Sequence, residues 1–147
     1  ADLRIRLVTP YQFKTKGEML VECQDQAHLR AHAFQSTSCG RYARTAFTHC
    51  GRCVPCLVRR SAIHHWGITD CTRYRYDNLS QNDLNHRHFD DVRSVVMAIE
   101  QVRQNSIDRW IGAALNSVQL GDITPYRAVV ERSLEELRVF LAAEGVL

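Results

Sequence analysis

Four cysteines in the first half of the chain have the type and the spacing of metal ligands. Cys50, Cys53 and Cys56 follow one another at intervals of three positions, and Cys39 precedes them across a ten-residue segment. Such tight spacing brings thiolates to one point more readily than it pairs them, and zinc prefers four soft ligands in a tetrahedron. Gly51 can take the backbone angles that a tight turn between Cys50 and Cys53 requires. The sequence therefore predicts one structural Zn²⁺ bound by Cys39, Cys50, Cys53 and Cys56.

The same residues leave alternatives open. An iron–sulfur cluster also uses four thiolates, and disulfides or buried free thiols would need no metal. His49, His64 and His65 lie close in sequence and could replace one cysteine, although four thiols already suffice. Cys23 and Cys71 are left over, and we expect each to be a small packing residue.

Charge and hydropathy narrow the kinds of partner that we expect. Five arginines near the cysteines would offset the negative charge of a four-thiolate centre: Arg41, Arg44, Arg52, Arg59 and Arg60. A nucleic-acid-binding zinc module is a third hypothesis, but the net charge of the 147-residue chain is only +3, and we do not expect a nucleic-acid partner. No apolar run approaches the length of a membrane span, and the first residues do not resemble a signal peptide. These features predict a protein of the reducing cytoplasm with no membrane partner.

The elements that position the cysteines are predicted to be short. Residues 3–8 alternate apolar and basic side chains, which is typical of a half-buried strand. Thr15 and Glu18 have the spacing of a capping box, so a helix should follow Thr15. Residues 35–56 have neither a helical nor a strand period, and we predict a loop ordered by the metal. A short helix is predicted over residues 56–66.

The last third of the chain has the apolar spacing of three amphipathic helices, over residues 90–103, 106–119 and 125–143. Thr124 and Pro125 have the types expected at the N-cap and the first helical position. We therefore predict two units, residues 1–80 around the metal loop and residues 86–147 as a helical extension. The extension should dock onto a partner surface or onto a missing amino-terminal part. The alternative is that it packs back onto the metal-binding region.

Ordered motifs across about residues 5–76 carry a family resemblance. They are Thr9-Pro10 through Lys16-Gly17-Glu18-Met19, Thr37-Ser38-Cys39, Cys50-Gly51-Arg52-Cys53-Val54-Pro55-Cys56-Leu57-Val58-Arg59-Arg60, Ile63-His64-His65-Trp66 and Asp70-Cys71-Thr72-Arg73-Tyr74. In this order they resemble the carboxy-terminal zinc region of the 7-cyano-7-deazaguanine synthase (QueC) family. The helical extension is most similar to that of QueC-like proteins in bacterial anti-phage systems, such as the Qat type.

The resemblance implies a fold, an activity and cofactors. The fold would be the carboxy-terminal portion of an α/β adenine nucleotide α-hydrolase-like (PP-loop) fold, here mostly α with an irregular zinc-ordered loop and one short edge of β. The activity would be a ligase that uses ATP and Mg²⁺ to convert 7-carboxy-7-deazaguanine into an amide and then a nitrile, in queuosine biosynthesis or in antiviral defence. Lys16, at the family's K-x-E position, and Arg59, after the cysteine run, are then the candidate catalytic residues.

Departures from the family pattern leave the enzyme question open. The S-G-G-x-D-S pyrophosphate loop does not occur in the sequence, and the Cys39–Cys50 segment is longer than usual. We therefore expect the chain to be inactive alone and to work with an amino-terminal PP-loop part, a partner subunit or a defence-system protein. The alternative is a non-enzymatic structural zinc module with a helical partner-binding domain.

Overall fold

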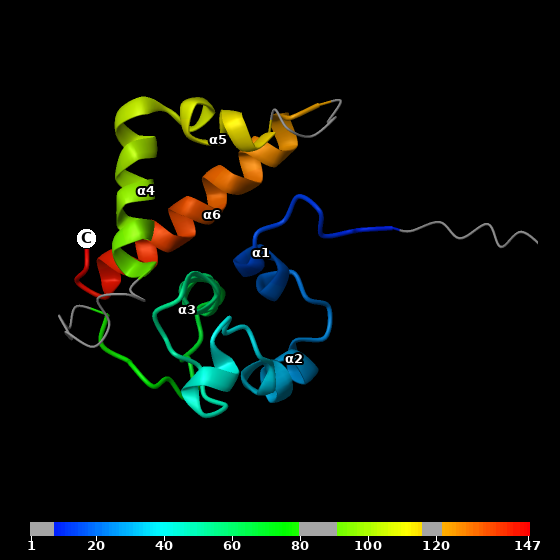
Figure 1. Cartoon of the computed structure of the whole chain (residues 1–147). Helices are drawn as coiled ribbons and strands as arrows, with labels where there is room; N and C mark the ends of the chain where they lie inside the picture. Colours follow the sequence, from blue (N-terminus) through cyan, green and yellow to red (C-terminus); the bar gives the residue numbers. More distant parts are fainter. Residues whose placement is uncertain (1–7, 80–90, 116–121) are drawn as a thin grey trace, which may run out of the picture.

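A computed structural model describes residues 8–79, 91–115 and 122–147 of the chain (Figure 1). Its elements in chain order are α1 (Lys16–Val21), α2 (Gln26–His32), two 3₁₀ turns (Ala33–Gln35 and Tyr42–Thr45), α3 (Val54–Trp66), α4 (Asp91–Asn105), α5 (Ile107–Leu115) and α6 (Thr124–Ala143). The described residues contain almost no β-structure beyond an isolated bridge between His49 and Tyr74. This confirms that the chain is mostly α. Residues 3–7 of the predicted strand lie outside the described residues.

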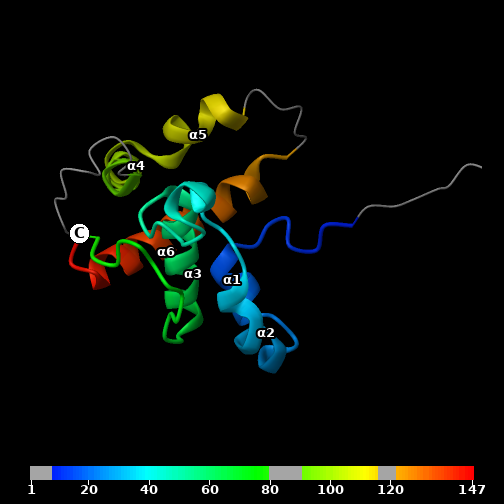
Figure 2. The same cartoon turned by 60° about the horizontal axis from the view of Figure 1, so that its bottom comes forward.

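The long helix α6 lies between two groups of helices. Figures 1 and 2 show α4 and α5 on one side of it and α3 with α1 on the other. α3 contacts α1, α4 and α6, so it joins the amino-terminal part of the chain to the helical extension. In the view of Figure 1, the metal loop and α2 lie on the opposite side of α3 from α5.

One hydrophobic core joins the two predicted units. Its buried side chains come from α3, the segment after it, α4 and α6: Leu57, Leu79, Val92, Val95, Ile99, Leu137, Phe140 and Leu141. The helical extension thus packs back onto α3, which was the alternative to docking elsewhere. The predicted boundary between the units, residues 81–85, lies outside the described residues.

α3 begins two residues before its predicted start. Cys53 is its N-cap and Pro55 lies in its first turn, where the missing N–H of proline leaves no hydrogen bond unmade. The helix ends at Gly67, whose φ of 74° is the left-handed conformation typical of a helix terminus. Cys56, a candidate metal ligand, therefore lies buried in the first turn of α3.

The helices of the extension are present, with corrected ends. α4 extends to Asn105, and α5 is described only to Leu115, so residues 116–119 of the predicted helix lie outside the described residues. Thr124 is not the N-cap of α6, because Ile123 occupies that position and Thr124 is the first helical residue. Asp122 Oδ1 instead accepts a hydrogen bond from the Thr124 N–H at 2.9 Å.

The predicted capping box starts α1. The Thr15 hydroxyl accepts the Glu18 N–H at 3.0 Å, and Glu18 Oε2 accepts the Thr15 N–H at 2.8 Å. α1 has only six residues, too few for a helix to be stable alone. Its contacts with α3 and with two α6 side chains, Arg132 and Glu136, therefore hold it in place.

The Arg132–Glu18 contact should make stability depend on acid pH. Partial burial raises the pKa of Glu18, but the hydrogen bonds from Arg132 and the Thr15 N–H and the charges of Arg132 and Lys14 outweigh it, so the net pKa lies below the usual 4.5. A depressed pKa stabilises the fold fully above that ordinary value, and this contribution is lost as the pH falls through the lowered one. We expect the melting temperature of the wild-type chain to exceed that of Glu18→Gln at neutral pH and to converge with it below pH 4.5. A difference in melting temperature between the two proteins that stays constant across this pH range would contradict the prediction.

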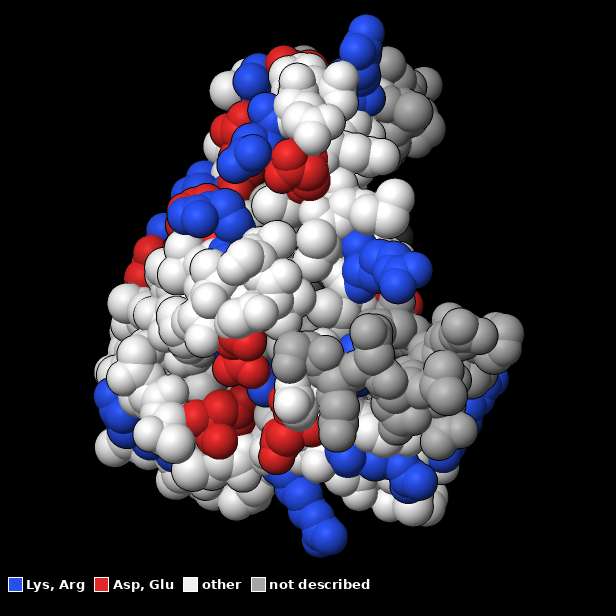
Figure 3. Space-filling view, turned by 90° about the vertical axis from the view of Figure 1, so that its left-hand side faces the viewer, with Lys and Arg blue, Asp and Glu red and all other residues white. Residues whose placement is uncertain are grey.

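The face of the molecule in Figure 3 carries charges of both signs. Basic and acidic side chains are interspersed there and form no continuous basic patch. Within the described ranges, no helix combines the length and the apolar character that crossing a bilayer requires.

Candidate metal centre and adjacent pocket

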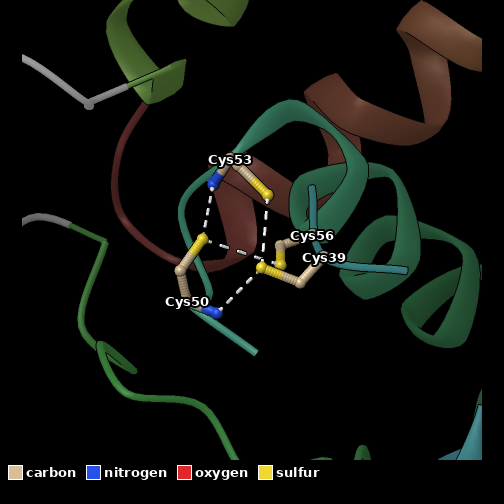
Figure 4. A group of neighbouring side chains, drawn as sticks. All are labelled: Cys39, Cys50, Cys53 and Cys56. Atoms are coloured by element: carbon tan, nitrogen blue, oxygen red, sulfur yellow. Dashed lines mark hydrogen bonds between the residues drawn. The ribbon is translucent and has the colours of Figure 1, made fainter. Parts of the chain in front are cut away.

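The four predicted cysteines converge on one point (Figure 4). Cys39 follows the first 3₁₀ turn, Cys50 and Cys53 flank a tight turn, and Cys56 lies in the first turn of α3. Their Sγ atoms all lie within 4.8 Å of one another, and all four side chains are buried. The Cys50–Cys56 and Cys39–Cys53 Sγ pairs are 3.8 Å and 3.9 Å apart.

These distances fit a single tetrahedral ion. A Zn–S bond of about 2.3 Å gives a tetrahedron with sulfur–sulfur edges of about 3.8 Å. A disulfide would bring two sulfurs to about 2.05 Å, and all four cysteines are free thiols. A cluster of several irons would separate the thiolates more widely, because its own atoms lie between them. The site could therefore hold one metal ion.

Backbone groups support the sulfurs. Cys39 Sγ accepts the Cys50 and Arg41 N–H groups, and Cys50 Sγ accepts the Cys53 N–H, each at 3.3 Å. Such donors stabilise thiolates. Gly51 has φ of +87°, and a Cβ there would overlap the carbonyl oxygen of Tyr76. Glycine is therefore required at this turn by both its backbone angle and its close neighbour.

The thiols interact strongly with one another. The hydrogen bond with Cys56 lowers the pKa of the Cys50 thiol, although burial opposes it. The same bond, together with burial, raises the pKa of Cys56, and burial raises that of Cys53. Without a cation, Cys53 and Cys56 hold their protons at neutral pH, whereas the Cys50 thiol, with a pKa of about 4, does not. A bound metal ion would replace the protons, which is how thiolate sites couple metal binding to deprotonation.

The histidines near the cluster are not among its four members. His49 Nε2 accepts the Ser38 N–H at 3.2 Å, and burial, followed by the charge of Arg59, lowers the pKa of this ring. His64 and His65 are exposed on α3, and His65 Nδ1 lies 4.0 Å from Glu136 Oε1. Of the two leftover cysteines, Cys23 is half-buried but Cys71 is exposed, so Cys71 is not the packing residue that we expected.

Two arginines that follow the cysteines in sequence form hydrogen bonds to several separate segments of the chain. Arg59 donates to the hydroxyls of Thr72, Ser36 and Ser38 and to the Ala33 carbonyl, at 2.8 to 3.3 Å. Arg60 donates to the Asp77 carbonyl and to Glu144, and its guanidinium lies over the rings of Tyr74 and Phe140. Both arginines are buried, so their charges lie in the interior and are held by oxygen and aromatic partners.

The two candidate catalytic residues line one pocket. Lys16 and Arg59 meet at a cavity of about 370 Å³ bounded by α1, α2, α3 and the segment before Cys39. Its apolar wall consists of Met19, Leu20, Leu29, Ala33, Ala62 and Ile63. His28 and His32 complete the rim, with ring centroids 4.4 Å apart. This histidine pair was not among the predicted site residues, although its four-residue spacing on a helix places both rings on one face.

Comparison with known proteins finds partial relatives of one kind. The chain is 37% identical over 70 residues to the 7-cyano-7-deazaguanine synthases of Brucella ovis, Brucella melitensis and Brucella suis. The match includes 48% of this chain and 28% of each synthase, so the chain spans only about a quarter of their length. No family model and no solved structure matches the chain. The chain is thus related to 7-cyano-7-deazaguanine synthases over part of its length.

Proposed function

We propose that this chain is the carboxy-terminal, metal-binding part of a QueC-like enzyme. The enzyme would use ATP and Mg²⁺ to form a C–N bond at the carboxyl group of a 7-deazaguanine, giving an amide or a nitrile. The observation that carries the proposal is the convergence of the four cysteines in a chain that is 37% identical over 70 residues to named synthases. The chain would then be the last portion of a PP-loop fold in the cytoplasm, and either nucleoside biosynthesis or anti-phage defence would use the product.

The metal in this proposal is Zn²⁺ with a structural role. All four candidate ligands are protein thiolates, so no coordination position is left open for substrate, as in closed structural zinc sites. Zn²⁺ would tie Cys39, Cys50 and Cys53 to the start of α3. Because α3 also carries Arg59, the metal would stabilise one wall of the pocket.

Lys16 and Arg59 are proposed to bind the anionic groups of the reactants. Arg59 is held by four acceptors, so it supplies a fixed positive charge at the pocket wall for a substrate carboxylate. Lys16 is exposed at the start of α1, where a flexible ammonium group can follow nucleotide phosphates or an acyl-adenylate. The apolar wall of the pocket suits a planar heteroaromatic ring between these two charges.

Alanine substitutions in the intact enzyme test this assignment. Lys16→Ala and Arg59→Ala should each lower turnover by about a hundredfold, the usual cost of removing one group that stabilises developing negative charge. Metal content should stay unchanged. Lys14→Ala is the matched control, because Lys14 is two residues away, is exposed and pairs with Glu22 at 2.7 Å. Unchanged turnover in Lys16→Ala and Arg59→Ala would refute their role.

We expect this chain alone not to bind ATP. Phosphates are normally anchored by clustered backbone N–H groups in a glycine-rich loop, and the sequence has no S-G-G-x-D-S motif. Isothermal titration of the metal-loaded chain with ATP and Mg²⁺ should show no saturable heat. A dissociation constant near the micromolar range would show that the nucleotide site lies within this chain.

A second candidate is a non-enzymatic zinc module that binds a partner through its helices. It is favoured by large apolar side chains that remain exposed on the surface. Phe47 is 73% exposed, and Met97 on α4 is 55% exposed. The turnover assay separates the two candidates, because a binding module would show no turnover in any intact protein that contains it.

A further inference from the structure

We propose that Glu136 of α6 is a positioning residue that fixes the start of α1 and thereby holds Lys16 at the pocket. The inference rests on the role given to Lys16 under the proposed function. It assigns a task to the helical extension, which would then contribute to the site without contacting substrate. Four contacts between α6 and residues 13–18 carry it.

The first contact joins a buried carboxylate to a buried hydroxyl. Thr15 Oγ1 donates its single proton to Glu136 Oε1 and accepts the Glu18 N–H. Thr15 is 2% exposed and Glu136 is 9% exposed, so water does not replace either partner. The N-cap of α1 is thus bound to a residue 121 positions away in the chain.

The second contact depends on the absence of a side chain at Gly17. A Cβ at this position would lie 2.7 Å from both carboxylate oxygens of Glu136, closer than such atoms can approach. Glycine inside a helix is unfavourable compared with alanine. Its presence within the short α1 is explained by the space that the Glu136 carboxylate occupies.

Arg132, one turn before Glu136 on the same face of α6, makes the remaining contacts. Its Nε lies 2.6 Å from Glu18 Oε1, and its Nη2 donates to the Phe13 carbonyl at 2.7 Å. Together the two α6 residues bind the chain on both sides of Lys16. Lys16 itself lines the pocket together with Arg59. A displacement of α6 must therefore move Lys16.

The test observes Lys16 directly in the metal-loaded full chain. Lys14 and Lys16 are the only lysines, so Lys14→Arg leaves Lys16 as the sole lysine while preserving a cation beside Glu22. Reductive ¹³C-methylation then gives one lysine signal in NMR spectra. In this background, Glu136→Ala should shift the Lys16 signal toward its position in the unfolded chain, and Glu136→Gln, which keeps an acceptor for Thr15, should restore it.

Two further variants keep the result interpretable. Glu135→Ala should leave the Lys16 signal in place, because exposed Glu135 pairs with Arg138 on α6 itself. Gly17→Ala should shift the signal as Glu136→Ala does, because the new methyl group displaces the carboxylate from Thr15, and it provides the test if Glu136→Ala does not fold. A purely structural role would lower the melting temperature and leave the Lys16 signal of the folded chain unchanged, and that result would overturn the proposal.

A titration with 7-carboxy-7-deazaguanine separates this inference from the proposed function. If both hold, the compound shifts the Lys16 signal of the wild-type pocket and has a much smaller effect in Glu136→Ala. If the compound has no effect on the wild-type signal, the assignment of this pocket as its binding site is contradicted. The shift produced by Glu136→Ala without ligand still decides the positioning role.

Discussion

Cys53→Ser is expected to remove the metal from the chain and to unfold residues 35–66, which include the metal loop and α3. The four cysteines are buried, and the pKa values of Cys53 and Cys56 are raised, so four thiolates at this point are costly without a cation. Structural zinc contributes about 10 kcal/mol or more to the folding of such sites at neutral pH. Elemental analysis of wild-type protein should find about one zinc per chain, and Cys53→Ser should have none. Loss of amide dispersion from residues 35–66 in NMR spectra would show the unfolding.

The chain contains a matched control for this substitution. Cys71→Ser changes an exposed cysteine outside the cluster, and it should leave both metal content and melting temperature unchanged. Iron with visible absorbance in the wild-type protein would contradict the zinc assignment. Protein that is folded with four free thiols and no metal would contradict the centre itself.

Phe140→Ala is expected to lower the free energy of unfolding by about 3–5 kcal/mol, the range for removing a buried aromatic side chain. Phe140 is 4% exposed and belongs to the core that α6 shares with Leu57 of α3. Its ring also contacts the Arg60 guanidinium at 5.4 Å, so the substitution removes a partner from a buried charge. Chemical denaturation monitored by circular dichroism measures the change.

Val139→Ala is the control for Phe140→Ala, because it changes the neighbouring residue of α6, whose side chain is 42% exposed. The loss should stay near 0.5 kcal/mol, as for ordinary surface positions. If the core is shared, Phe140→Ala shifts a single transition that includes both the metal loop and the helices. Two separate transitions, with the loop region unaffected, would show that the predicted units fold independently.

The convergence of Cys39, Cys50, Cys53 and Cys56 could be predicted largely because three of them are close in sequence. Three of the four cysteines lie within one turn and the start of one helix, so local geometry alone brings them together. The capping box of α1 and the amphipathic helices follow from the same short-range rules, since a hydrogen bond or an apolar face repeats over three or four residues. The partial relationship to 7-cyano-7-deazaguanine synthases was also visible in the order of these motifs.

Other features depend on contacts between residues that are far apart in the sequence. Arg59 looked like a charge partner or a catalytic group, and only the fold shows it bound to Thr72 and Ser36 while lining a pocket with Lys16. The Glu136–Thr15 contact joins residues 121 positions apart, and no local pattern specifies which helix covers α1. Gly17 is the clearest case. The sequence shows only an unfavourable helix residue, and the reason for it is a carboxylate that packing brings against the backbone from α6.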